Sequence, residues 1–126
     1  VADELGLPLI YVRSKPKDHG LENLIEGEMK RGAKVVVIED LISTGLSSLK
    51  AVEAIRKAGG NVIGMVAAYT YGFPVAAEAF KNAGVELITL TDYEHVVGNA
   101  LETGYIQETD TKLLHEWRED PSHWKR

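Results

Sequence analysis

The residues best suited to chemistry form one short run, in which two acids precede a group of small hydroxylated residues. Glu39 and Asp40 end a β-branched stretch, and Ser43, Thr44 and Gly45 follow after two apolar positions. The N–H groups of a tight turn, hydroxyl groups and a helix N-terminus can together hold a phosphate. The carboxylates suit ribose hydroxyls or a Mg²⁺ ion instead. The run therefore predicts a site for a phosphorylated sugar.

Plainer interpretations compete with that prediction. Ser43 or Ser47 could simply cap the next helix, with the two acids ending a strand in solvent. The chain contains neither G-x-x-x-x-G-K-[ST] nor G-x-G-x-x-G, which disfavours a Walker-type or dinucleotide site. A phosphoacceptor receiver domain also carries paired acids at a strand end. It further needs an acid and a lysine at later strand ends, where this sequence has Tyr69-Thr70 and Leu90-Thr91.

The elements around the run alternate between strands and helices. Residues 34–39 hold four consecutive β-branched residues before the acid, a pattern typical of a strand buried on both faces of a parallel sheet. We expect a tight loop over 40–45 after this strand. Further strands are predicted over 9–12 (buried), 25–29 (edge), 61–69 and 85–90, and helices over 47–58, 74–83, from a Thr91 or Asp92 cap to about 102, and over 109–117.

This alternation implies right-handed crossovers and an α/β fold, with an open parallel sheet flanked by helices. Ligands of such sheets bind beyond the carboxyl ends of the strands, which is where Glu39 and Asp40 fall. The core has four strands at most, and the chain lacks a starting Met. We therefore expect that further sequence precedes Val1.

Composition narrows the possible functions. The 126 residues suit one domain, and 44% apolar and 26% charged residues are ordinary for a globular protein. A net charge of −5 argues against general nucleic-acid binding. Apolar runs are far shorter than the roughly 20 residues that span a membrane. The absence of cysteine excludes disulfides and thiolate chemistry, and it fits a cytoplasmic location.

A basic segment stands out on this acidic chain. Arg13, Lys15, Lys17 and His19 fall within seven residues, inside a polar stretch over 13–24 that carries a proline and a glycine. Such a run is usually a solvated surface. Loops of about a dozen residues in compact domains are often functional, so a small anionic ligand is the other interpretation.

Two stretches carry a family resemblance. VVVIEDLISTG, residues 35–45, resembles the phosphoribosyl-pyrophosphate (PRPP) binding motif of type I phosphoribosyltransferases. The upstream stretch YVRSKPKDHGLENLIEGE resembles the flexible catalytic loop of the orotate phosphoribosyltransferases, in which Lys-Asp-His-Gly follows an arginine. The resemblance implies a type I phosphoribosyltransferase fold. It covers nearly the whole chain and implies one catalytic domain over 1–126 that lacks its N-terminal segment.

The resemblance also implies roles for single residues. Glu39 and Asp40 match the acidic pair that holds the 2- and 3-hydroxyls of ribose. The next segment matches the loop that binds PRPP at its 5-phosphate, namely Leu41, Ile42, Ser43, Thr44, Gly45, Leu46 and Ser47. Ser43 also falls near the base, and Tyr71 is a further candidate for base binding. Pyrophosphate is expected to contact Arg13, Lys15, Lys17 and His19, and the candidate catalytic residues are Lys17, Asp18 and His19.

The implied reaction transfers the phosphoribosyl group from PRPP to orotate and gives orotidine 5-monophosphate and pyrophosphate, in de novo UMP synthesis. Mg²⁺ is the implied cofactor, held mainly by PRPP near Glu39 and Asp40. The segment 13–24 is expected to reach the neighbouring active site in a homodimer. Many orotate enzymes carry a base-binding arginine where this chain has Thr70-Tyr71-Gly72-Phe73. A phosphoribosyltransferase for another base, or a non-catalytic PRPP- or nucleotide-binding regulator, therefore remains an alternative.

Overall fold

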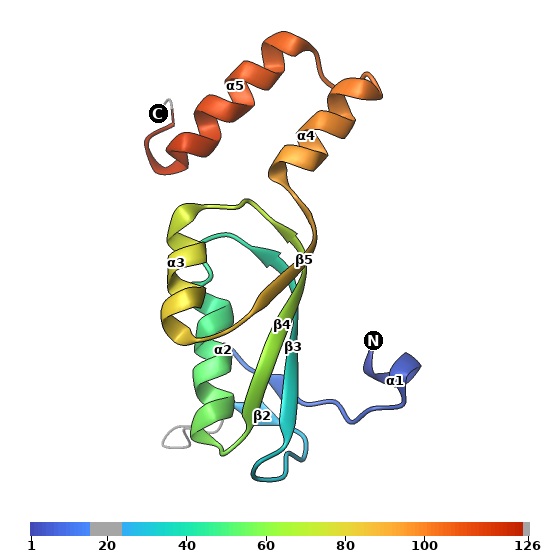
Figure 1. The fold of residues 1–126 in the computed structure, drawn as a ribbon, viewed down its shortest axis with the longest axis vertical. Helices are drawn as coiled ribbons and strands as arrows, with labels where there is room; N and C mark the ends of the chain where they lie inside the picture. Colours follow the sequence, from blue (N-terminus) through green and yellow to red (C-terminus); the bar gives the residue numbers. More distant parts are fainter. Residues whose placement is uncertain (16–23, 125–126) are drawn as a thin grey trace.

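The computed structural model describes residues 1–15 and 24–124 and shows a twisted sheet with helices along one side and at one end (Figure 1). The elements follow in the order α1 (Ala2–Leu5), β1 (Tyr11–Val12), β2 (Ile25–Glu26), β3 (Lys34–Ile42), α2 (Leu46–Lys57), β4 (Asn61–Thr70), α3 (Pro74–Ala83), β5 (Leu87–Asp92), α4 (Tyr93–Glu102), α5 (Glu108–Glu119) and a 3-10 turn (Pro121–His123).

The main sheet confirms the predicted α/β architecture. Within the described residues, β3, β4 and β5 form a parallel sheet in that order. Ile42 pairs with Thr70, and Thr70 pairs with Asp92, so the three strands end level with one another. The segments that follow the three strands therefore meet along one edge, which is the edge where parallel sheets bind ligands.

The strand that leads to the acidic pair is longer than predicted. β3 continues through Leu41 and Ile42, which pair with Tyr69 and Thr70 of β4. Both residues are apolar, and Ile42 is fully buried in the core, so burial extends the strand past the acids. The turn is thus confined to residues 43–45.

The predicted buried strand over residues 9–12 is wrong. Only Tyr11 and Val12 form a strand, which pairs antiparallel with Ile25–Glu26 in a separate sheet, while Leu9 and Tyr11 are 75% and 64% exposed. A parallel neighbour of β3 would need a long crossover, whereas the short connection over 13–24 permits a hairpin. Ile10 and Val12 pack on the core, so this apolar run buries only alternate residues.

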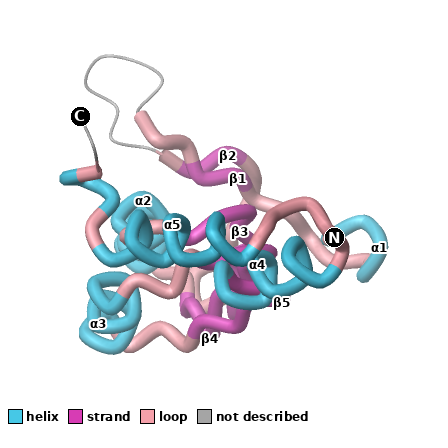
Figure 2. The backbone as a smooth tube through the Cα atoms, turned by 90° about the horizontal axis from the view of Figure 1, so that it is seen from above, coloured by secondary structure: helices cyan, strands magenta, loops and turns pink. Residues whose placement is uncertain are grey.

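The helices α2 and α3 cover one face of the main sheet (Figures 1 and 2). The apolar spacing of α2 turns Val52 and Ile55 toward Met65 of β4, and α3 adds Phe80. α3 begins with Pro74 in its first turn and ends at Gly84 with φ 67°, as its sequence predicts. This packing fixes the start of α2 against the ends of the strands.

The opposite face of the sheet is open. Val36, Ile38, Ile88 and Leu90 point to this face and are 46%, 54%, 55% and 77% exposed, so nothing in the described part of the chain covers them. Parallel sheets are usually covered on both faces. The total accessible surface is 9594 Å², whereas a folded protein of 13.8 kDa usually exposes about 6600 Å². The helices of this chain therefore flank one face and leave an apolar surface on the other.

Candidate functional site

The turn between β3 and α2 depends on Gly45. This residue is buried with φ 82°, and its carbonyl accepts the first helical hydrogen bond from the N–H of Leu49 (2.9 Å). A Cβ at this position would lie 2.7 Å from Cε2 of Phe80. Glycine is therefore required twice over, by the left-handed backbone and by the aromatic ring beneath the turn.

The start of α2 offers donors to an anion. Ser43, Thr44 and Ser47 are exposed around the turn. No described side chain caps the helix in the usual way, although Thr44 Oγ1 lies 3.4 Å from the N–H of Leu46. The N–H groups of a first helical turn lack intrahelical acceptors, and the helix dipole favours negative charge there. The N-cap is Gly45, so the interpretation in which Ser43 or Ser47 caps the helix is not supported.

The two acids have different surroundings. Oε2 of Glu39 accepts a hydrogen bond from Oγ of Ser48 (2.8 Å), and the Ser48 side chain is buried. Asp40 is exposed, and the side chain of Glu39 and the N–H of Leu41 hold the pKa of Asp40 below its usual value. Successive strand residues point to opposite faces, so Glu39 is fixed against α2 while Asp40 is the accessible, ionised acid.

Sequence reasoning did not assign a role to Ser48. The signal that could have found it is its place in the first turn of the helix, one residue beyond the exposed Ser47. On a helix that packs against the strand it follows, one of two neighbouring residues turns back toward that strand. Here that residue is Ser48, whose only described acceptor is Glu39.

The apolar residues of the run divide between core and surface. The Ile42 side chain is fully buried, and its carbonyl accepts the N–H of Tyr71 (3.1 Å) and lies 3.5 Å from Oγ1 of Thr70. Leu41 and Leu46 are exposed on either side of the turn. Ile42 thus ties the turn to the segment after β4, and the two leucines border the hydroxylated surface.

The described part of the basic segment, Arg13 and Lys15, lies away from this turn. Arg13 follows β1, where its N–H donates to the carbonyl of Leu24 and its guanidinium pairs with Glu26 (3.3 Å). Figure 1 shows β2 of this hairpin near the amino end of β3, opposite the end that leads into α2. Lys15 is exposed. The predicted catalytic residues Lys17, Asp18 and His19 lie outside the described residues.

The segment after β4 is an aromatic cluster. The ring of Tyr71 contacts four others, with centroid distances of 5.2, 5.4, 6.0 and 5.6 Å to Tyr69, Phe73, Tyr93 and Trp117. Burial, followed by the neighbouring Tyr71 and Tyr93, raises the pKa of Tyr69 to about 12. Burial also raises the pKa of Tyr93, whose hydroxyl donates to the carbonyl of Leu114 (2.8 Å). Tyr71 therefore stands beside the β3–α2 turn at the centre of a partly buried aromatic cluster.

The third strand end carries a separate polar pair. Oδ1 of Asp92 caps α4 by accepting the N–H of His95 (2.9 Å) and also contacts its Nδ1 (2.7 Å). These two interactions hold the pKa of Asp92 below its usual value, and Asp92 raises the pKa of His95. The pair accounts for the predicted cap at Asp92.

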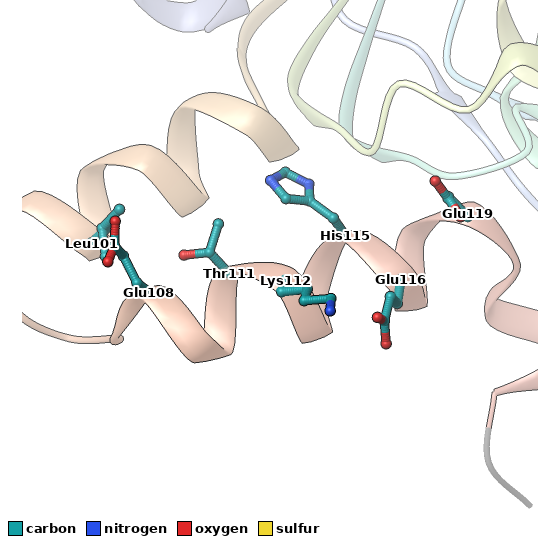
Figure 3. A pocket seen from close by; sticks show the side chains of 7 residues that line it. All are labelled: Leu101, Glu108, Thr111, Lys112, His115, Glu116 and Glu119. Atoms are coloured by element: carbon teal, nitrogen blue, oxygen red, sulfur yellow. The ribbon is translucent and has the colours of Figure 1, made fainter.

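A hollow of about 550 Å³ runs along α5 beside the end of α4 (Figure 3). Its lining includes Leu101, Thr111 and His115 together with three glutamates and a lysine. The predicted site residues are not among the residues that line it. Its opposing charges and open shape match no single ligand class, so we locate the candidate site at the β3–α2 turn.

No group of three or more His, Asp or Glu side chains in 1–15 and 24–124 is arranged to hold a metal ion. None of the helices in this part of the chain is long and apolar enough to cross a membrane. Carboxylates such as Asp40 suit Mg²⁺ when substrate phosphates complete its ligands, so the residues present fit an ion brought in with a substrate.

Comparison with known proteins identifies the family. The phosphoribosyl transferase domain matches residues 1–98, which include the β3–α2 turn and the aromatic segment after β4. The chain belongs to this family. The match ends within α4, so α5 of this chain lies outside the matched residues.

Individual relatives narrow the comparison. The chain is 73% identical to orotate phosphoribosyltransferase of Bacteroides thetaiotaomicron over 124 residues, which cover 98% of this chain and 58% of that protein. Orotate phosphoribosyltransferase of Aeropyrum pernix superposes with a TM-score of 0.71 at 30% identity, over 84% of this chain and 57% of the other. The Mycobacterium tuberculosis enzyme in complex with PRPP gives 0.53 at 33% identity, over 60% and 45%. This phosphoribosyl transferase domain thus spans less than two thirds of the length of these relatives.

Proposed function

We propose that this phosphoribosyl transferase domain carries the PRPP site of an enzyme that transfers the phosphoribosyl group to orotate, giving orotidine 5-monophosphate and pyrophosphate in pyrimidine synthesis. The observation that carries the proposal is the β3–α2 turn. It joins an ionised Asp40 to exposed hydroxyl groups and to the start of α2, where the N-cap Gly45 provides no side-chain cap. The 73% identity to a protein named for this activity supports the choice of base.

Each part of the turn suits one part of PRPP. The 5-phosphate would bind at residues 43–47, where backbone N–H groups, the dipole of α2 and the hydroxyls of Ser43, Thr44 and Ser47 act together. Ribose hydroxyls would donate to Asp40 and Glu39. The hydrogen bond from Ser48 keeps Glu39 in one orientation before the sugar arrives. The site is therefore organised in advance for the sugar phosphate.

As the bond to pyrophosphate breaks, the ribosyl carbon becomes cation-like and negative charge builds up on the leaving oxygens. Pyrophosphate departure therefore requires positive charge near those oxygens. A Mg²⁺ ion bound with PRPP, and held also by Asp40 and Glu39, would supply part of that charge. Arg13, Lys15 and Lys17 would supply the rest. His19 of the same segment would donate a proton to the departing pyrophosphate, and Asp18 would orient that proton. Removing one preorganised contact of this kind typically slows a reaction by about 100-fold.

A homodimer is part of the proposal. The hairpin that carries Arg13 lies at the opposite end of β3 from the phosphate turn (Figure 1). Within one copy of the chain, Arg13 therefore lies far along β3 from the turn. A second copy would bring the basic segment of one copy to the turn of the other. The reaction would take place in the cytoplasm, as the lack of cysteine suggests.

Calorimetry with PRPP and Mg²⁺ tests the site. We would compare this chain with its Asp40→Asn variant. Each of the two sequences would also be tested as a graft, in which it replaces the matching segment of the Bacteroides thetaiotaomicron enzyme. Asp40→Asn should weaken PRPP binding at least tenfold. A neutral amide is a weaker acceptor of hydrogen bonds from ribose hydroxyls than a carboxylate, and it is also a weaker ligand for Mg²⁺. Asp3→Asn is the matched control, because Asp3 is an exposed aspartate in α1.

Product analysis separates the proposal from its alternatives. Formation of orotidine 5-monophosphate by the graft supports orotate transfer. A product with another base but not with orotate would indicate a different phosphoribosyltransferase. Tight PRPP binding without a product from any base would indicate a regulator. Equal PRPP affinities for Asp40→Asn and Asp3→Asn would contradict a sugar-phosphate site at this turn.

A further inference from the structure

The last turn of α5 holds the segment that follows β4. Nε of Arg118 donates to the carbonyl of Tyr71 (2.8 Å), and Nη2 donates to the carbonyl of Gly72 (3.0 Å). The two residues are 47 and 46 positions away in the sequence. One guanidinium thus fixes two consecutive carbonyls, an arrangement that its planar fork of donors allows and a lysine does not.

The surroundings of Arg118 make this contact specific. Its guanidinium carbon lies 5.9 Å from the centroid of the Tyr93 ring, and Nη1 lies 4.0 Å from Glu94. Trp117 packs against Tyr71 and Tyr93 at 5.6 and 5.8 Å. Gly72 has φ 69°, and a Cβ there would lie 2.9 Å from Nη2 of Arg118. The segment 71–73 is therefore shaped to receive this guanidinium.

The same segment reaches the phosphate turn. The N–H of Tyr71 donates to the carbonyl of Ile42 (3.1 Å), and the N–H of Gly72 donates to Oγ1 of Thr70 (3.1 Å). Ile42 directly precedes the exposed hydroxyl groups of the turn. A continuous set of hydrogen bonds therefore connects α5, residues 71–72 and the end of β3.

We propose that Arg118 is a positioning residue, which holds residues 71–73 beside the phosphate turn and thereby sets the affinity of the site for its nucleobase. This inference rests on the proposed function, because it takes the surface next to the turn as the place of the base. It gives a role to α5, which lies beyond the family match that ends at residue 98. The aromatic rings then serve as a rigid support and Arg118 as the clamp.

The first test does not depend on activity. Hydrogen exchange of the Tyr71 amide reports its bond to Ile42, and Arg118→Ala in the 126-residue chain should accelerate this exchange at least tenfold. Arg56→Ala is the matched control, since Nη1 of Arg56 also donates to a distant carbonyl, that of Ala83 (2.8 Å). Unchanged exchange in Arg118→Ala, or equal acceleration in both variants, would overturn the proposal.

The second test separates positioning from general stability. In the graft, Arg118→Ala should raise the KM for orotate at least tenfold and leave the KM for PRPP within twofold. Guanidinium ion at millimolar concentration should restore part of the orotate affinity of Arg118→Ala but not affect Arg56→Ala. A parallel rise in both KM values, or an unchanged KM for orotate, would contradict a positioning role for Arg118. A graft that makes no product with orotate refutes the proposed function, and the exchange experiment then decides on Arg118 alone.

Discussion

The two halves of the candidate site are built in different ways. The proposed sugar-phosphate side comes from the contiguous residues 39–48, and its hydrogen bond from Ser48 to Glu39 joins residues nine positions apart. The proposed base side gathers Tyr71, Tyr93 and Trp117 from three separate segments and is closed by Arg118. Ile42 is the residue at which the two sides meet.

Because they are built differently, the two sides should respond differently to substitution. A turn made of neighbouring residues needs a suitable backbone and one supporting side chain, so a single substitution can disrupt it. A cluster of rings from distant segments shares its packing among many contacts, and the loss of one contact is partly compensated by the rest. We therefore expect the steepest mutational effects at the glycine of the turn, and graded effects among the rings of the base side.

The largest effect is expected at Gly45. Gly45→Ala must adopt φ 82° and place its Cβ 2.7 Å from Phe80, so the free energy of unfolding should fall by about 2–4 kcal/mol. Urea denaturation measures this change. Gly84→Ala is the matched control, because Gly84 has φ 67° but no atom within 4 Å of the added Cβ, and about 1–2 kcal/mol is expected. Equal losses in the two variants would mean that Phe80 does not support the turn.

The same difference decided how much the sequence could predict. The acids, the hydroxyl groups and Gly45 are neighbours in the chain, so their types and spacing predicted the turn. The alternation of strands and helices predicted the parallel sheet around it. The contact between Arg118 and residues 71–72 depends on how α5 packs, and nothing near either segment indicates it. The prediction of a buried strand over residues 9–12 was wrong for a related reason. An apolar run does not reveal whether both of its faces pack against other elements.

A smaller effect is expected at Ser48. Ser48→Ala removes the donor of a partly buried hydrogen bond to Glu39, which should weaken PRPP binding about threefold to tenfold and lower the free energy of unfolding by about 1 kcal/mol. Calorimetry and urea denaturation measure the two quantities. Ser122→Ala is the control, because Ser122 makes a comparable bond to Asp120 (2.9 Å) away from the site. If both serine variants bind PRPP like the parent chain, Glu39 needs no fixed orientation.

The smallest effect concerns the base side and its titration. The pKa of Tyr69 is raised to about 12, mainly by burial, whereas an unfolded tyrosine titrates near 10. The folded state therefore holds this proton more tightly than the unfolded chain. The resulting stabilisation is fully present below about pH 10 and is lost as the pH rises toward 12.

Ultraviolet absorbance of tyrosinate measures this titration. Tyr69→Phe should remove a late ionisation step near pH 12 and leave the earlier steps in place. It keeps the ring that meets Tyr71 edge-on at 5.2 Å, so the cluster should stay packed and stability at neutral pH should change little. A titration without a late step, in a chain that is still folded at that pH, would mean that water reaches Tyr69. The base side would then be as open to solvent as the phosphate turn, and the contrast between the two halves would not hold.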